Sequence, residues 1–287
     1  MYPRAFAYAR PHTVDEALDL LAEHGSDAGV LAGGMSLVPQ LKYRQRGPAV
    51  VVDIGGLRDL AGLTLDAGVL RIGALTRHAE AAQWCGHAGL AMVAELAGRI
   101  GDPQVRNMGT VGGSLAAVEP TGDWGAALLA VRGEVVARAG AGQRTIAADD
   151  LFVATHTSSL RPDELLTEVG VPVPGGRFGT AQAKFEQRAG AALMSCAVCL
   201  ELDPDTDQVL AAGVAAVGLA GHPVRLDAVE QAVHGQWFDE ALLDEVAAIV
   251  RGRDPDYRRS VLGRLVRDAL RDAAARARAT DDGEEAG

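Results

Sequence analysis

The apolar positions in the first 56 residues predict one small unit of mixed helix and strand. Thr13 and Glu16 have the spacing of a capping box, and the apolar positions after them continue to Gly25, which can end a helix. Residues 30–32 and 50–54 are short apolar runs typical of strands, whereas the residues before Thr13 are expected to form a loop. This order of elements predicts an α/β subdomain over about residues 1–56.

Between residues 57 and 176 the apolar runs are shorter. Residues 63–65 and 69–72 flank Asp66-Ala67-Gly68, a turn typical of a β-hairpin. Helices are expected over 76–84 and 90–100, and strands around 134–138 and 168–173. These mixed connections predict an α+β fold rather than a regular strand–helix alternation. The turn-forming run 172–176 predicts a boundary, so residues 1–176 form one domain with a second subdomain over about 57–176.

The remaining residues predict a smaller domain of sheet and helices over 177–278. Its strands are expected over 181–186, 195–203 and 209–219, and its helices over 227–234, 239–251 and 256–278. Residues 279–287 are expected to be a polar tail. Residues 251–278 contain nine arginines and four aspartates, a local net charge of +5. This basic helix is either a partner surface or a solvated helix with internal ion pairs, and both alternatives stay open.

Composition removes several classes of function. The 287 residues carry a net charge of −11 and are 48% apolar, which excludes general disorder and argues against nucleic-acid binding. No apolar run is long enough to span a bilayer and the first residues lack a secretory signal, so a cytoplasmic protein is expected. Three cysteines are too few to hold an iron–sulfur cluster. Cys196 and Cys199 lie in a predicted strand, where they should face opposite sides and be buried and inert.

Two segments with glycine pairs are the candidates for chemistry. Gly33 and Gly34 follow a predicted strand, and Gly112 and Gly113 repeat the pattern about 80 positions later, each pair before a serine. Without a Cβ atom, successive backbone N–H groups can converge on an anion. Either pair alone could be a tight turn; together they favour a diphosphate held from both sides, as in a dinucleotide. Asp123, farther along, suits either ribose hydroxyl groups or the N-cap of the next helix.

Common catalytic motifs are absent. The sequence has no P-loop, no G-x-G-x-x-G after a strand, no G-x-S-x-G and no H-E-x-x-H. The seven histidines have no metal-ligand spacing, so neither a metal site nor a catalytic acid or base is predicted. The only two lysines, Lys42 and Lys184, and the only asparagine, Asn107, fall near the glycine segments or the predicted domain boundary.

The segments 32–37 and 101–115, the stretch around Pro120 and Asp123, and the runs 165–169, 184–185 and 256–259 together resemble the FAD-binding medium subunits of molybdenum hydroxylases, the carbon monoxide dehydrogenase and xanthine dehydrogenase type. The resemblance covers nearly the whole chain. It implies a two-part FAD-binding domain of the vanillyl-alcohol oxidase type, followed by a smaller C-terminal domain. It also implies FAD-binding residues: Leu31, Ala32, Gly33, Gly34, Met35, Ser36, Leu37, Thr110, Gly112, Gly113 and Ser114 at the diphosphate, Asp123 at the ribose or diphosphate, Ile100 and Leu166 near the ring systems, and Lys184 near the flavin.

By the same resemblance, the chain is an electron-transfer subunit. Its partners would be a small subunit with [2Fe-2S] clusters and a large subunit with a molybdenum–pterin cofactor, in a dimer of heterotrimers. Substrate chemistry would then belong to the large subunit. Two other functions stay open: a stand-alone FAD oxidoreductase, and a scaffold that has lost its flavin. Met35, Glu119 and Ala191 depart from residues that are common in the family, which affects the expected flavin environment.

Overall fold

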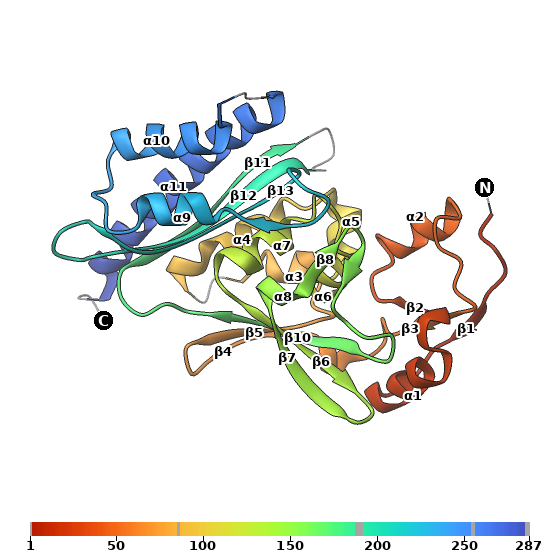
Figure 1. The fold of residues 1–287 in the computed structure, drawn as a ribbon. Coiled ribbons are helices and arrows are strands. Elements are labelled where there is room, and N and C mark those ends of the chain that lie inside the picture. The colour runs from red at the N-terminus through yellow and green to blue at the C-terminus, as the bar shows by residue number, and fades with distance from the viewer. Residues whose placement is uncertain (1, 85–86, 187–191, 254–255, 285–287) are drawn as a thin grey trace.

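The computed structural model describes residues 2–84, 87–186, 192–253 and 256–284. Its N-terminal subdomain is a parallel sheet in the order β1-β3-β2 with two helices and a short 3-10 turn at 25–27 (Figure 1). The predicted first helix and both predicted strands are confirmed, whereas β1 and α2 were not predicted. Three residues of strand and six of helix are too short to give a periodic signal. The elements are β1 (Ala7–Ala9), α1 (Val14–His24), β2 (Ala28–Leu31), α2 (Leu37–Lys42) and β3 (Val50–Asp53).

The second subdomain contains an antiparallel sheet in the order β4-β5-β10-β6-β7. The predicted hairpin is confirmed, and its turn uses positive φ angles at Ala67 (47°) and Gly68 (75°). Short 3-10 turns lie at 58–60 and 88–90. The elements are β4 (Leu63–Asp66), β5 (Val69–Gly73), α3 (His78–Ala81), α4 (Ala91–Gly98), α5 (Pro103–Met108), α6 (Val111–Ala117), α7 (Asp123–Ala130), β6 (Glu134–Ala139), β7 (Gly142–Ala147), α8 (Ala148–Leu151), β8 (Phe152–Ala154), β9 (Thr157–Ser158) and β10 (Leu165–Pro172).

Residues 103–117 form two short helices, which corrects their interpretation as glycine-bearing loops. The Asp102 carboxylate accepts a hydrogen bond from the Val105 N–H at 2.8 Å, and Pro103 occupies the first turn of α5. Thr110 caps α6 in the same way. Both start signals are present in the sequence, but the glycines of α6 conceal them, because glycine weakens any helical pattern.

The C-terminal part is an antiparallel sheet, β11-β12-β13-β14, between two helical layers (Figure 1). Helices α9, α10 and α11 lie on its outer side, and α7 of the second subdomain packs against β12 and β13 from the other side. The predicted order of three strands and three helices is confirmed, although α11 continues six residues past the expected end at 278. The elements are β11 (Phe178–Glu186), β12 (Ala192–Leu202), β13 (Val209–Val217), β14 (Val224–Arg225), α9 (Asp227–Val233), α10 (Glu240–Arg251) and α11 (Tyr257–Glu284).

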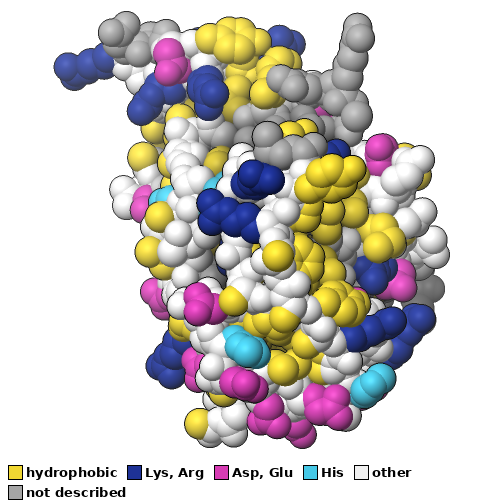
Figure 2. Space-filling model, turned by 90° about the vertical axis from the view of Figure 1, so that its right-hand side faces the viewer, with side chains coloured by type: hydrophobic (Ala, Val, Ile, Leu, Met, Phe, Trp, Pro, Cys, Tyr) yellow, Lys and Arg dark blue, Asp and Glu magenta, His cyan; other side chains and the backbone are white. Residues whose placement is uncertain are grey.

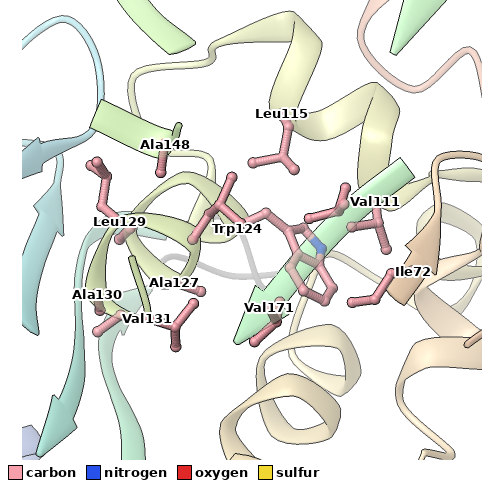
Figure 3. Packing of buried hydrophobic residues seen from close by; sticks show 14 of the residues in the cluster. Ile72, Val111, Leu115, Trp124, Ala127, Leu129, Ala130, Val131, Ala148 and Val171 are labelled. Carbon is pink, nitrogen blue, oxygen red and sulfur yellow. The ribbon is translucent and has the colours of Figure 1, made fainter. Parts of the chain in front are cut away.

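The largest core lies between the central sheet, α7 and the C-terminal sheet. Figure 3 shows Trp124 of α7 among Ile72, Val111, Leu115 and Val171. Because both faces of β12 are covered, alternate residues of this strand enter different cores. This arrangement positions α6 and α7 rigidly, and with them the second glycine segment and Asp123.

The two described cysteines lie on opposite faces of β12, as predicted. Cys199 belongs to the core shared with α7, and Cys196 to the core under the outer helices. Burial raises the pKa of Cys199 to about 12 and raises that of Cys196 as well. Neither thiol is therefore a nucleophile near neutral pH. Cys85 lies outside the described residues. In the described part of the chain, no helix has the length and apolar character to cross a membrane.

Candidate functional site

The first glycine segment, residues 32–36, lies where β2 leaves the parallel sheet. The loops at this edge of a parallel sheet commonly hold ligands. Gly34 adopts a positive φ of 76°, which turns the chain sharply before α2. Among the described residues, none accepts a hydrogen bond from the backbone N–H of Gly33, Gly34, Met35 or Ser36. Gly33 is buried and two of the others are half-buried, where unpaired N–H groups are uncommon, so the loop is suited to bind an anion.

Backbone contact joins the first glycine segment to the second. A Cβ atom on Gly33 would lie 2.0 Å from the Met108 carbonyl oxygen and 2.9 Å from the Gly109 Cα, so only glycine fits here. A Cβ atom on Gly113 would lie 3.6 Å from the Ala32 Cβ. Segments that are far apart in the sequence thus form one continuous surface, with the unpaired N–H groups at one side.

The second glycine segment does not offer free backbone donors, which corrects the sequence analysis. The N–H of Gly112 donates to the Ala74 carbonyl at 2.9 Å, and that of Gly113 donates to the Thr110 hydroxyl at 3.2 Å. The Ser114 N–H donates to the Thr110 carbonyl at 3.0 Å. This segment is the first turn of α6, and what it presents outward is side chains, above all the half-buried Ser114 hydroxyl.

The stretch Arg77-His78 holds the second segment in place, and sequence reasoning missed it. The Arg77 guanidinium donates to the Met108 carbonyl, and the His78 backbone N–H donates to the Gly109 carbonyl at 3.1 Å. The imidazole of His78 lies under Gly109, where a Cβ atom would be 2.8 Å from its Nε2. The only hint in the sequence is a glycine just before the Thr110 cap, and that glycine could serve other purposes.

His78 is a neutral imidazole with a fixed tautomer. The indole N–H of Trp124 donates to the His78 Nδ1 at 3.2 Å, so the neutral ring carries its proton on Nε2. Burial, together with the nearby charge of Arg77, lowers the pKa of His78 from 6.5 to about 4. The support under the second segment is therefore uncharged near neutral pH.

Asp123 and Lys184 form a buried ion pair between α7 and β11. The Lys184 ammonium lies 2.8 Å from the Asp123 Oδ2 and donates to the Arg99 carbonyl at 2.9 Å. The other carboxylate oxygen, Oδ1, accepts a hydrogen bond from the buried Ser195 hydroxyl at 2.6 Å. The N-cap of α7 is Gly122, so the interpretation of Asp123 as the capping residue is wrong. Its contact with a ribose or diphosphate stays a prediction.

Comparison with known proteins matches this geometry to one family. Residues 4–174 match the model "FAD binding domain in molybdopterin dehydrogenase", and residues 181–273 match "CO dehydrogenase flavoprotein C-terminal domain". The chain belongs to the FAD-binding medium subunits of molybdenum hydroxylases, the carbon monoxide dehydrogenase and xanthine dehydrogenase type. Its α+β fold, with a two-part FAD-binding domain and a C-terminal domain, is that of the family.

Named relatives match over nearly the whole chain. The carbon monoxide dehydrogenase medium chain of Hydrogenophaga pseudoflava is 34% identical, with 96% of this chain and 99% of the relative covered. The 6-hydroxypseudooxynicotine dehydrogenase complex subunit alpha of Paenarthrobacter nicotinovorans is 33% identical, with 98% and 99% covered. A solved carbon monoxide dehydrogenase from H. pseudoflava, lacking the Mo-pyranopterin moiety of its cofactor, superposes with a TM-score of 0.90 at 33% identity, covering 96% of this chain and 99% of that one.

The remaining residues that the family resemblance selects are mostly apolar packing residues. Leu166 of β10 is buried in the central core and Ile100 is half-buried beside it. Leu37 packs in a small core under α2, with Leu31 against it. Their places near the rings of a bound FAD stay predictions.

The three departures from the family pattern have different surroundings. Met35 is 40% exposed at the tip of the first glycine segment. The carbonyl of the half-buried Glu119 accepts a hydrogen bond from the Gly122 N–H at 3.0 Å, in the turn before α7. Ala191 lies outside the described residues.

The arginines of the C-terminal helix are largely engaged within the chain. Arg267 and Arg271 both pair with Glu240 of α10, at 2.7 and 2.9 Å. Arg276 pairs with Glu95 at 2.7 Å, and Arg278 pairs with Asp207 at 2.8 Å. These contacts support the interpretation of an ion-paired helix over that of a partner surface. Most of them join α11 to other elements, whereas the sequence analysis expected pairs along one helix.

Proposed function

We propose that residues 32–36 bind the diphosphate of FAD through their unpaired backbone N–H groups. Four consecutive donors at the edge of a parallel sheet fit a group with several anionic oxygens. The hydroxyl groups of Ser114 and Thr110 lie on the adjoining segment, where they would donate from the other side. The family match supports this assignment, and the four unpaired N–H groups carry it.

The chain's own residues hold and shape the site rather than perform proton chemistry. FAD supplies a centre that takes electrons singly and can release them in pairs. Gly33 lets the first segment lie against Met108, and His78 supports the second segment with a neutral ring. Asp123 compensates the charge of Lys184, so this pair closes the junction between α7 and β11 without placing a net charge there.

The electrons would reach this chain from [2Fe-2S] clusters in a small subunit, after substrate oxidation at a molybdenum–pterin centre in a large subunit. The relatives named as medium chains support partners of this kind. We propose the same arrangement here, assembled as a dimer of heterotrimers in the cytoplasm, with electrons passed to an external acceptor. A stand-alone FAD oxidoreductase is not favoured, because the relatives are subunits of larger complexes.

The substrate is not encoded in this chain. Relatives whose names give carbon monoxide and 6-hydroxypseudooxynicotine match at 34% and 33% identity, so likeness to either does not select a substrate. This agrees with substrate recognition in a separate large subunit.

The first experiment purifies this chain with its co-expressed neighbours, records the visible spectrum and identifies the cofactor released on denaturation. FAD with iron–sulfur absorption is the expected result. FAD without any partner would support the stand-alone enzyme instead. A chain that stays free of flavin after incubation with FAD would refute the proposed site.

The Gly33→Ala variant tests the first segment directly. Its methyl group would collide with the Met108 carbonyl and displace the loop, so FAD affinity should fall about tenfold or more while the circular dichroism spectrum is unchanged. Gly140→Ala is the matched control, since nothing lies within 4 Å of its added Cβ. Equal FAD binding by both variants would contradict the assignment.

A further inference from the structure

A basic and aromatic surface lies around α2, directly after the first glycine segment. It contains four cationic side chains and three exposed aromatic ones: Arg4, Lys42, Arg44, Arg46, Tyr2, Phe6 and Tyr43. We call these seven residues the α2 patch. It is continuous, because the Arg44 Nε donates to the Tyr2 carbonyl at 3.0 Å and the Arg4 side chain lies against Gly47. Figure 2 views this side of the molecule and shows Lys and Arg side chains beside a band of hydrophobic ones.

The cations of the α2 patch differ from the arginines of α11. Within the described residues, none of the four makes an ion pair, whereas Arg267, Arg271, Arg276 and Arg278 are all paired inside the chain. The patch is also a local reversal of charge in a chain with a net charge of −11. A positive surface on an acidic protein favours an acidic partner and repels other acidic regions.

The composition of the patch is that of a protein interface. Tyr2 is 86% exposed and Tyr43 is 63% exposed, although tyrosine and arginine are the residues that contribute most where protein surfaces meet. Arg44 adds a second sign of selection for something other than stability. It has a positive φ of 58° at the C-terminal end of α2, a position that normally belongs to glycine.

The place of the patch decides which partner fits it. Helix α2 begins at the residue after the proposed diphosphate loop, and the Val38 N–H donates to the Gly34 carbonyl at 3.0 Å. A protein docked on α2 would therefore lie next to the proposed flavin site, where an electron donor must be. We propose that the α2 patch is the docking surface for an acidic face of the iron–sulfur subunit. This inference rests on the proposed function.

The test compares two double variants that change the net charge equally. Lys42→Glu/Arg46→Glu alters the patch at side chains without a hydrogen bond or ion pair in the described structure, and Arg259→Glu/Arg264→Glu does the same on α11. Each FAD-loaded chain is titrated with the purified iron–sulfur subunit at low and at high salt. The α2 variant should bind about tenfold more weakly at low salt, with a smaller difference at high salt, and the α11 variant should bind like the wild type.

Three results would overturn the docking surface: equal weakening in both variants, no weakening in either, or wild-type binding to phosphatidylserine vesicles that only the α2 variant loses. The last result would assign the patch to anionic lipid. The flavin content of every sample is measured separately. A chain without FAD that still binds the subunit through the α2 patch would refute the proposed cofactor site alone. A chain with FAD whose association ignores the α2 patch would refute the docking surface alone.

Discussion

The two glycine segments are nearly interchangeable in sequence and opposite in structure. Residues 33–36 leave their backbone N–H groups without a partner, whereas Gly112, Gly113 and Ser114 donate theirs to Ala74 and Thr110. In the first segment glycine creates binding capacity. In the second it allows close packing, because a Cβ atom on Gly112 would lie 2.5 Å from the Ala74 Cβ.

This difference shows that a glycine pair before a serine specifies close backbone approach and does not say what approaches. The deciding factor is what precedes the pair. A strand that ends at a sheet edge leaves the following loop free of regular hydrogen bonds. A threonine at the N-cap position instead recruits the next N–H groups into a helix. The acceptors of the backbone donors must therefore be known before a glycine segment is assigned to an anion.

The largest expected effect comes from filling the space at Gly112. A Gly112→Val substitution places atoms within 3 Å of the Ala74 Cα and carbonyl, so we expect the free energy of unfolding to fall by about 3 kcal/mol. Urea unfolding measures this, with Gly140→Ala as a control that should change little. If Gly112→Val were as stable as the wild type but lost FAD, the second segment would act like the first, and the contrast between them would fail.

The sequence was sufficient for the order of the main elements but not for the short ones. The long apolar runs of β12 and β13 and the periodic pattern of α10 predicted those elements to within a few residues. The helices α2, α5 and α6 were missed, because each has at most seven residues and contains proline or glycine. In such elements capping and tertiary packing outweigh periodicity.

The candidate site was predictable as a set of segments and not as a set of contacts. The adjacency of Gly33 and Met108, the support of Gly109 by His78 and the pairing of Asp123 with Lys184 join residues 31 to 75 positions apart. No local pattern encodes such partners. The family resemblance selected Asp123 and Lys184 individually, but only the fold shows that they neutralise each other.

The second prediction concerns acid and the support under the second segment. Since the pKa of His78 is lowered from 6.5 to about 4, the unfolded chain binds a proton at His78 that the folded chain does not, between these pH values. Stability from this residue is thus retained above pH 6.5 and lost as the pH falls, by about 2 kcal/mol between pH 6.5 and 5.

The His78→Gln variant isolates this contribution from that of other titrating groups. Its amide oxygen can accept the Trp124 N–H but does not titrate. The difference in unfolding free energy between wild type and variant should therefore narrow by about 2 kcal/mol as the pH falls to 5. A constant difference across this range would mean that His78 is not held neutral by burial.

The smallest effect separates the two explanations for Gly113. A Gly113→Val substitution would place a Cβ atom 2.5 Å from the Thr110 hydroxyl and break the cap of α6, which should cost about 1 kcal/mol. A Thr110→Ala variant loses the same cap without adding volume. If Gly113 serves only the helix, both variants bind FAD equally well, as the occupied N–H groups indicate. If FAD approaches Gly113 closely, Gly113→Val binds it far more weakly at equal stability, and the second segment then takes part in binding through its shape and side chains rather than its backbone donors.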